Sequence, residues 1–243
     1  MSRIDNEPAF VLHAYPYKET SLVVDAFTAS HGRVALVARG AKRPKSALRG
    51  LLQAFQPLLL SWSGKGEVKT LMHAEWQGGL PLLGGEALLC GFYVNELLLK
   101  LLLRDDPHPQ LFTAYREALH ALATQTELAP TLRRFELRLL AELGYGLQLE
   151  READTGEPLR AEARYYYVFD RGPQRSPASP AQAEEVSGAT LLALARNDFS
   201  DPQATQESKR LMRQVLNYYL ERQRLFSRQM LQDLQSFEET THD

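Results

Sequence analysis

Up to about residue 77, hydrophobic and polar residues follow the short, alternating pattern that is typical of β-strands. Five such runs are rich in branched and aromatic residues and are separated by turn residues such as His31-Gly32. Pro57, beside the fourth run, should mark the start of that strand or a bulge. Five short strands favour a small closed or nearly closed barrel, because closure removes exposed strand edges. The predicted strands are residues 9–15, 21–28, 32–39, 57–62 and 67–76.

Beyond the glycine-rich segment 78–85 (GGLPLLGG), the hydrophobic period becomes helical. The first predicted helix is apolar nearly all round, so it should be central to a helical core. The second should begin after Asp106-Pro107, and the third should be opened by Pro130 and end at a glycine C-cap near Gly144. The predicted helices cover residues 86–103, 111–123 and 131–143.

Residues 150–182 interrupt the helical pattern with one strand-like run among turn residues. We interpret this segment as a small loop or hairpin excursion that ends in a mobile Pro/Ser-rich stretch. Helix returns at residues 189–196 and again from Thr205 to about Ser236. In the last helix an apolar stripe is expected to pack; it consists of Leu211, Val215, Tyr219 and Phe226.

These patterns predict an α+β protein with two domains. Residues 1–79 would form the barrel, and residues 80–243 would form an α-helical domain that contains the excursion. The most hydrophobic segment, Leu80 to Leu103, is interrupted by charged and amide side chains, so it reads as a buried helix and no membrane partner is expected.

Charge is unevenly distributed along the chain, whose formal net charge is -2. Residues 1–80 hold ten Lys/Arg against six Asp/Glu, and no acidic residue occurs between Asp25 and Glu67. Residues 38–50 (ARGAKRPKSALRG) alone hold five basic side chains. Such asymmetry suggests a polyanionic partner, and a solvated loop with chance clustering of charge is the alternative. The basic residues between Asp25 and Glu67 are Arg33, Arg39, Lys42, Arg43, Lys45, Arg49 and Lys65.

Known catalytic and cofactor-binding patterns do not occur in the sequence. It has no P-loop motif and no G-x-S-x-G, and its six histidines form no metal-binding spacing. Cys90 is the single cysteine and lies in an apolar run, where a packed thiol is expected; a reducing cytoplasm is the natural compartment. The sequence therefore points to a binding protein without cofactors or metal ions, rather than to an enzyme.

The basic stretch suits the chemistry of a nucleic-acid backbone. Affinity for a polyanion comes from several cations that displace counterions from successive phosphates. Small barrels bind single strands by pairing a charged groove with aromatic side chains on which bases stack. The aromatic candidates are Tyr15, Tyr17, Phe27 and Trp62, although aromatic residues on short strands also serve as core.

An ordered set of motifs resembles the bacterial RecO family of DNA repair proteins. No single motif is specific, but their order covers the chain from Ala9 to Arg228. The motifs are AFVLHAYPYKETSLVVDAFT, the stretch from His31 to Glu75, the NELL within residues 93–98, LRRFELRLLAELGYG, TGEP at 155–158 and SKRLMRQVLNYYL.

The resemblance implies an N-terminal OB-fold followed by a helical domain. It also implies a recombination mediator of the bacterial cytoplasm and nucleoid, which binds single- and double-stranded DNA and anneals complementary strands. The implied partners are RecR, with which it loads RecA, and the acidic C-terminal tail of the single-stranded-DNA-binding protein SSB. Many family members carry a four-cysteine zinc motif near residues 150–167. This chain has no cysteine there, so the turn at 154–158 is expected to be metal-free.

The residues expected to serve this function fall into three groups. Loop 39–49, assisted by Arg33 and Lys65, is the candidate DNA contact. Arg133 and Arg134, backed by Phe135 and Leu137, are the candidates for the SSB tail, and a solvated arginine pair on an amphipathic helix is the alternative. A third group either extends the DNA track or faces solvent; it consists of Lys209, Arg210 and Arg213.

Three rival functions stay open from the sequence. The first is an RNA-binding OB-fold protein without an annealing role, which would recognise the 2′-hydroxyl. The second is a metal-dependent nuclease that uses acidic residues such as Glu19 and Asp25. The third is a structural adaptor, which leaves the concentration of positive charge unexplained.

Overall fold

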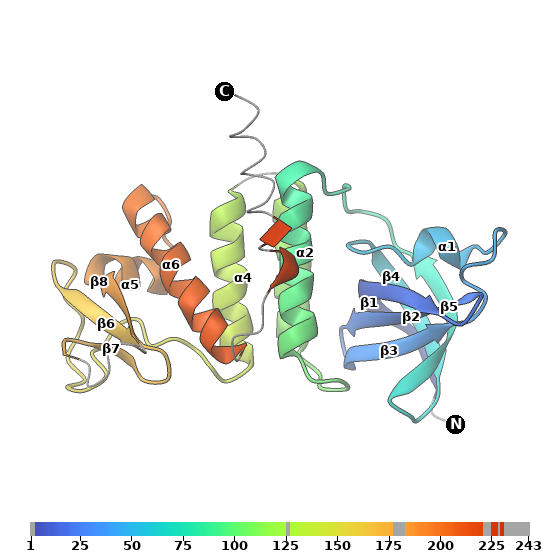
Figure 1. Cartoon of the computed structure of the whole chain (residues 1–243), viewed down its shortest axis with the longest axis horizontal. Helices are drawn as coiled ribbons and strands as arrows, with labels where there is room; N and C mark the ends of the chain where they lie inside the picture. Colours follow the sequence, from blue (N-terminus) through green and yellow to red (C-terminus); the bar gives the residue numbers. More distant parts are fainter. Residues whose placement is uncertain (1–2, 125–126, 177–182, 221–224, 228, 231–243) are drawn as a thin grey trace. The chain divides into compact units, whose positions relative to one another are not determined.

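The computed structural model describes residues 3–124, 127–176, 183–220, 225–227 and 229–230. The chain forms two compact units (Figure 1). Unit 1 contains residues 1–126 and 225–243, and unit 2 contains residues 127–224. The predicted boundary after residue 79 lies between the last barrel strand and the first long helix, whereas the compact units divide after residue 126 because two helices pack on the barrel.

The N-terminal strands form a closed five-stranded barrel with the order β1-β2-β3-β5-β4. The β3–β5 pair is parallel and the other pairs are antiparallel. All five predicted strands are confirmed, and Pro57 is the first residue of β4. The elements are β1 (Arg3–Tyr17), β2 (Ser21–Thr28), β3 (Gly32–Ala38), α1 (Leu48–Leu51), β4 (Pro57–Ser63) and β5 (Val68–Trp76).

Strand β1 is longer than the sequence pattern indicated, because it pairs with β2 and with β4. Irregularities at Ile4/Glu7 and at Val11/His13 bend it from one partner toward the other. The side chains that point inward fill the barrel with small and branched residues, which suits a lumen of this size. They include Ala9, Val11, Val24, Val34, Leu36, Leu58, Leu60 and Trp62.

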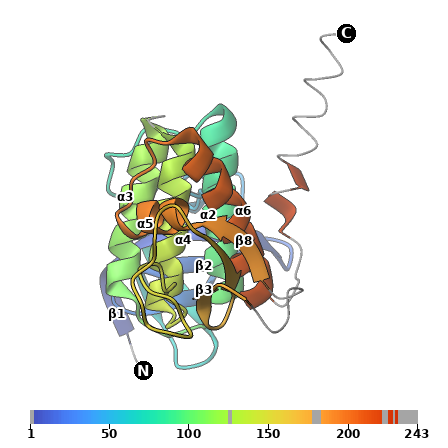
Figure 2. The same ribbon diagram turned by 90° about the vertical axis from the view of Figure 1, so that its left-hand side faces the viewer.

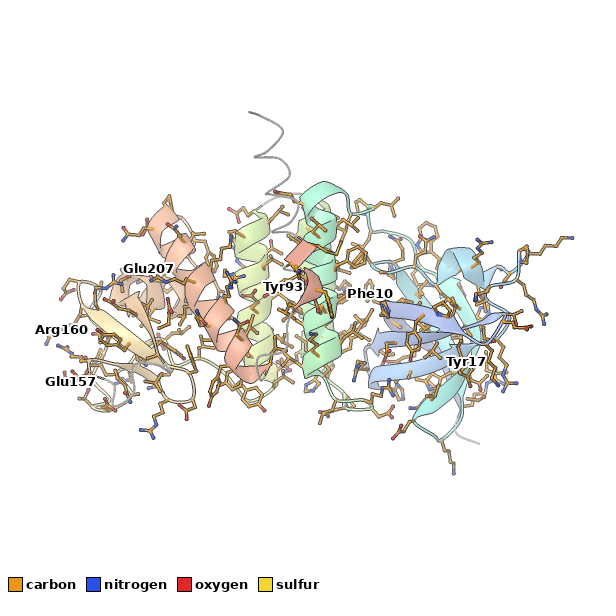
Figure 3. The ribbon with its side chains drawn as sticks, viewed as in Figure 1. Phe10, Tyr17, Tyr93, Glu157, Arg160 and Glu207 are labelled. Carbon is orange, nitrogen blue, oxygen red and sulfur yellow. The ribbon has the colours of Figure 1, made fainter. Side chains whose placement is uncertain are left out.

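Two helices, α2 (Gly85–Leu101) and α3 (Pro109–Ala123), pack on the outside of the barrel within unit 1. Phe10 and Phe27 meet Phe112 and Tyr115 of α3 with ring centroids 5.2–6.0 Å apart. Figure 3 shows Phe10 on the side of the barrel that faces these helices. Aromatic packing of this kind joins barrel and helices into one core.

A buried amide secures the same junction. The Asn95 side chain of α2 donates to the Leu12 carbonyl over 2.9 Å and accepts from the Tyr115 hydroxyl over 2.7 Å. Burial raises the pKa of Tyr115, so its hydroxyl stays protonated and donates this bond. Cys90 is buried on the same helix, as expected from its apolar surroundings.

The connection between α2 and α3 lies against the start of β3. The Asp105 N–H donates to the Arg33 carbonyl over 2.9 Å. Gly32 has a φ of +65°, and a Cβ there would lie 1.9 Å from the Asp106 carbonyl oxygen. Glycine is therefore required at this close approach.

Unit 2 combines three helices with a small antiparallel sheet of order β7-β6-β8. The predicted hairpin within residues 150–182 is confirmed by the antiparallel pair of β6 and β7, and the acidic segment at 183–187 adds a third strand that the sequence pattern did not indicate. Figure 2, which faces unit 2, shows β8 beside α6. The elements are α4 (Leu128–Glu142), β6 (Arg164–Val168), β7 (Gly172–Gln174), β8 (Ala183–Ser187), α5 (Gly188–Ala195) and α6 (Pro202–Tyr219).

Helix α6 begins earlier than the pattern indicated. Asp201 caps its N-terminus by accepting from the N–H groups of Gln203 and Ala204. The helix ends at Tyr219, and most of the predicted extension to Ser236 lies outside the described residues, as does most of the Pro/Ser-rich stretch. Leu211 and Val215 pack as expected, but the prediction for Phe226 is wrong, since this side chain is 72% exposed.

A buried carboxylate in unit 2, Glu207 of α6, gathers donors from several elements (Figure 3). It accepts from the Ser187 N–H and hydroxyl at 3.1 and 2.8 Å, from the Thr190 hydroxyl at 2.7 Å and from Arg164 at 3.2 Å. Burial opposes ionisation, but these donors outweigh it and lower the pKa of Glu207 to about 2. The carboxylate therefore connects β6, β8 and α5 to α6.

The substitution Glu207→Gln should destabilise the protein by about 1–3 kcal/mol at pH 7, because buried donors lose a charged acceptor. The pKa of Glu207 lies below its ordinary value in the folded state, so its contribution is present above about pH 4.5 and is lost as pH falls toward about 2. Urea unfolding followed by circular dichroism at pH 7 and pH 3 should show a smaller difference at pH 3. Glu162→Gln, at an exposed position, is the control. Equal effects of the two substitutions would contradict the account.

Candidate nucleic-acid interface

Residues 39–49, called here the basic loop, run from the end of β3 into the first residues of the short helix α1. Its backbone turns three times in succession: the Arg43 N–H donates to Gly40, the Ser46 N–H to Arg43 and the Arg49 N–H to Ser46, over 3.0–3.2 Å. Gly40 adopts a φ of +70°, the left-handed conformation that starts this series. The basic side chains are therefore carried on a regular, hydrogen-bonded backbone.

Apolar side chains fix both ends of the basic loop to the barrel. Ala41 and Leu52 belong to the barrel core, and Leu48 and Leu51 pack against it. The Lys42 N–H also donates to the Thr20 carbonyl over 2.9 Å, which connects the basic loop to the β1–β2 turn. Because these residues point inward, the charged residues between them point to solvent.

The five cations of the basic loop are exposed, and none of them forms an ion pair with any residue that the structure describes. Lys65, in the connection between β4 and β5, is exposed in the same way. The predicted DNA-contacting residues that keep an open charge in unit 1 are Arg39, Lys42, Arg43, Lys45, Arg49 and Lys65.

Arg33, which was also predicted to contact DNA, differs from this group because its charge is paired. Its guanidinium lies 3.7 Å from Asp25, and Arg104 approaches the same oxygen to 3.5 Å. Burial lowers the pKa of Arg33, although Asp25 opposes this change. The arginine neutralises a buried carboxylate, and its side chain is only 16% exposed.

Two of the four aromatic candidates are exposed on β1, near the β1–β2 turn to which the basic loop is bonded. Tyr15 and Tyr17 are 38% and 40% exposed on β1, whereas Phe27 and Trp62 are buried and serve as core, the alternative stated for them. Lys18, which the sequence analysis did not single out, lies with its Nζ 5.3 Å from the centre of the Tyr17 ring. Its signal was its place in the PYKET turn between two strands. Figure 3 labels Tyr17 on the opposite side of the barrel from Phe10.

The predicted SSB-tail residues on α4 have different environments. Arg133 is only 7% exposed and donates to Glu136 over 2.6 Å. Its charge therefore serves an internal ion pair, unlike the accessible cation that was predicted. Arg134 is partly exposed, 3.6 Å from Glu127, with its guanidinium 5.4 Å from the Phe199 ring. The predicted pocket of two arginines is thus reduced to one arginine beside an aromatic ring.

The three cations on α6 also differ from one another. Lys209 and Arg213 are exposed. Arg210 pairs with Glu184 and donates to the Glu185 carbonyl over 3.1 Å, so it fastens β8 to α6 while its side chain stays 55% exposed. Lys209 and Arg213 form no ion pair with any residue that the structure describes.

The turn at residues 154–158 is confirmed and is held by side chains. Gly156 has a φ of +72°, and its N–H donates to the Glu152 carbonyl over 3.0 Å. The buried Glu152 carboxylate accepts from Arg175 over 2.8 Å and from Thr155 over 3.0 Å. Arg175 lowers the pKa of Glu152, so this carboxylate stays ionised. Polar contacts thus connect the turn to β7 and its flank.

In the described ranges, no three histidine, cysteine or acidic side chains are grouped in a way that could hold a metal ion. Every helix there is too short or too polar to cross a membrane.

A closed barrel with the order β1-β2-β3-β5-β4 and a helix between its third and fourth strands defines an OB-fold protein. Residues 1–79 match the family model described as Recombination protein O N terminal, and residues 83–229 match Recombination protein O C terminal. The chain therefore belongs to the RecO family of DNA repair proteins.

Similar proteins span nearly the whole chain. A protein named DNA repair protein RecO from Aromatoleum aromaticum is 55% identical over 233 residues, which are 96% of this chain and 97% of that relative. Proteins of the same name from Azoarcus sp. and Nitrosospira multiformis are 54% and 52% identical, again over 96% of this chain and 97% of each relative.

The geometry predicts a ranking of lysine reactivity. Lys42, Lys45 and Lys65 should be acetylated several-fold faster than Lys69, because Lys69 is largely covered and lies 2.6 Å from Asp105. Brief treatment of the folded protein with acetic anhydride, followed by peptide mass spectrometry, measures these rates. Similar rates for Lys42 and Lys69 would contradict the open placement of the basic loop.

Proposed function

We propose that this protein is a non-enzymatic recombination mediator that binds single- and double-stranded DNA and anneals complementary strands. The observation that carries the proposal is the basic loop, whose five exposed cations form no ion pair with any described residue and are carried on an anchored backbone. The DNA repair role of the RecO family supports DNA as the polyanion.

The chemistry of the basic loop suits phosphates more than bases. Arginine and lysine side chains that replace condensed counterions bind any sequence, because phosphate contacts carry no base information. A protein that holds only the backbone leaves base edges free to find their complements. This is the requirement for annealing.

Aromatic rings beside the cations favour a single strand. Tyr15, Tyr17 and Lys18 lie near the β1–β2 turn, to which the Lys42 N–H is bonded through Thr20. Exposed rings offer stacking to unpaired bases, worth about 1–3 kcal/mol per base, whereas duplex bases are already stacked. A strand would thus meet phosphate-binding and base-stacking groups at one end of the barrel.

Unit 2 would supply the contact with the SSB tail. Arg134, next to the ring of Phe199, combines a cation with an aromatic surface, and this pair suits an acidic peptide that ends in an aromatic residue. Lys209 and Arg213 would add a second DNA contact. With RecR, the protein would then help to load RecA on strands that SSB covers.

The triple substitution Arg39→Glu, Lys42→Glu and Arg43→Glu should weaken single-strand binding strongly. The slope of log affinity against log salt should decrease by about 0.7 for each lost phosphate contact. Fluorescence anisotropy with a labelled oligonucleotide at several salt concentrations measures both quantities. The matched control is Arg116→Glu, Arg171→Glu and Arg196→Glu, three exposed positions with the same change of charge.

Equal losses in the two triple variants would show a net-charge effect and remove the basic loop from the mechanism. Competition between DNA and RNA oligonucleotides of one sequence tests the rival RNA-binding function. A preference for RNA would favour that rival, since only RNA carries a 2′-hydroxyl.

Arg134→Glu should slow annealing of complementary strands coated with SSB and leave annealing of bare strands unchanged. SSB without its acidic tail should remove the difference between variant and wild type. Arg138→Glu, a partly exposed arginine on the same helix, is the control. If Arg134→Glu slows bare strands equally, Arg134 does not serve the SSB tail.

A further inference from the structure

Four aromatic side chains from three segments of unit 2 meet, and they are called here the aromatic cluster. Tyr145 follows α4, Phe169 lies in the turn between β6 and β7, and Tyr218 and Tyr219 end α6. The Tyr145 ring stacks on Tyr219, with centroids 4.4 Å apart and planes 23° apart. Tyr218 meets Tyr219 edge-on at 5.2 Å and lies 5.5 Å from the Phe169 ring. These are the separations and angles of interacting aromatic pairs.

The end of α4 fixes the position of Tyr145. Gly144 adopts a φ of +82°, and its N–H donates to the Ala141 carbonyl over 3.1 Å. The Tyr145 N–H donates to the Leu140 carbonyl over 2.8 Å. This pair of bonds around a left-handed glycine is a common end of an α-helix. The backbone that carries the Tyr145 ring is therefore well defined.

Tyr219 holds the other members of the aromatic cluster together. Its hydroxyl donates to the Phe169 carbonyl over 3.0 Å, and its ring contacts both Tyr145 and Tyr218. Burial raises the pKa of Tyr219, so the hydroxyl stays protonated and keeps this bond. The rings are thus arranged before any ligand arrives, which lowers the entropic cost of binding.

Two rings of the aromatic cluster are open to a ligand. Tyr145 is 46% exposed and Tyr218 is 43% exposed, more than Tyr15 and Tyr17 on the barrel. Tyr219 covers one face of the Tyr145 ring, and the exposure of Tyr145 leaves room for a further flat ring. Exposed apolar groups that gather on one surface mark interaction sites.

The charge on α6 indicates which ligand the aromatic cluster suits. Lys209 and Arg213 lie on the same helix as Tyr218, are exposed, and form no ion pair with any residue that the structure describes. Positive side chains bind phosphates, and aromatic rings stack with unpaired bases. A ligand that offers both phosphates and flat rings is a single-stranded nucleic acid.

We propose that the aromatic cluster is a stacking site for unpaired bases of single-stranded DNA, with Tyr145 and Tyr218 as the rings that bases contact. This proposal rests on the proposed function, because it takes single-stranded DNA as the ligand. It gives unit 2 a contact with bases in addition to phosphates. Duplex bases are already stacked on one another, so the aromatic cluster favours single strands over duplex.

Photo-cross-linking of the full-length protein tests the contact between base and ring. The probe is a single-stranded oligonucleotide that carries 5-iodouracil, and peptide mass spectrometry locates the adducts. We expect adducts on Tyr145 or Tyr218 and none on Tyr166, which is 36% exposed on β6 and outside the aromatic cluster. Adducts confined to unit 1 would overturn this proposal and leave the basic loop as the DNA site. Failure of the protein to bind any single strand would overturn the proposed function as well.

Substitution of the ring separates stacking from a structural role. Tyr145→Leu should lower affinity for an oligothymidine about fivefold or more, and it should leave affinity for an abasic strand of the same length unchanged. The salt dependence of binding should not change, because stacking displaces no counterions. Tyr145→Phe keeps the ring and should retain affinity, and Tyr166→Leu is the matched control.

Circular dichroism shows whether each variant folds, and Tyr218→Leu is used if Tyr145→Leu does not. Equal losses for the oligothymidine and the abasic strand would show that the ring only supports the fold. An unchanged affinity for both strands would show that no base stacks there. Either result would overturn the proposal.

Discussion

The burial of Ala41 in the barrel core, together with the bond from the Lys42 N–H to Thr20, is the constraint on which the candidate site depends. A loop with five cations would repel itself into many conformations if only its charged residues decided its path. Alanine and leucine side chains at its two ends fix that path instead. The barrel therefore pre-organises a charged surface before any ligand arrives, which lowers the entropic cost of binding.

Ion pairing decides which basic side chains are available to a ligand. Asp25 occupies Arg33 and Arg104, Glu136 occupies Arg133, and Glu184 occupies Arg210. Arg33, Arg104 and Arg210 connect elements within their own unit, whereas Arg133 pairs within α4. The cations of the basic loop are exposed and have no acidic partner among the described residues. Their charges are therefore neither buried nor neutralised by a neighbouring carboxylate. Arginine thus serves two purposes in this chain: with a carboxylate partner it stabilises the fold, and without one it can bind a ligand.

Much of the barrel could be predicted from sequence, because period-two alternation and Pro57 define strand faces and starts locally. The exposed cations were also readable, since no acidic residue lies near them in sequence. The pairing of Arg33 could not be predicted, because the site it shares with Asp25 includes Arg104, which lies in the connection between α2 and α3. The Arg133–Glu136 pair could have been predicted, because residues spaced i, i+3 on a helix are neighbours on its surface. The third strand of the small sheet was hidden because AEEVS lacks the apolar residues of a typical strand.

The central claim is that phosphates bind at the basic loop, and lysine footprinting with bound DNA tests it most directly. Acetylation of the full-length protein is measured by mass spectrometry with and without a saturating single-stranded oligonucleotide. The account predicts strong protection of Lys42 and Lys45 and no change at Lys69, which is already paired with Asp105. Full binding of the oligonucleotide with Lys42 and Lys45 still as reactive as in the free protein would contradict it.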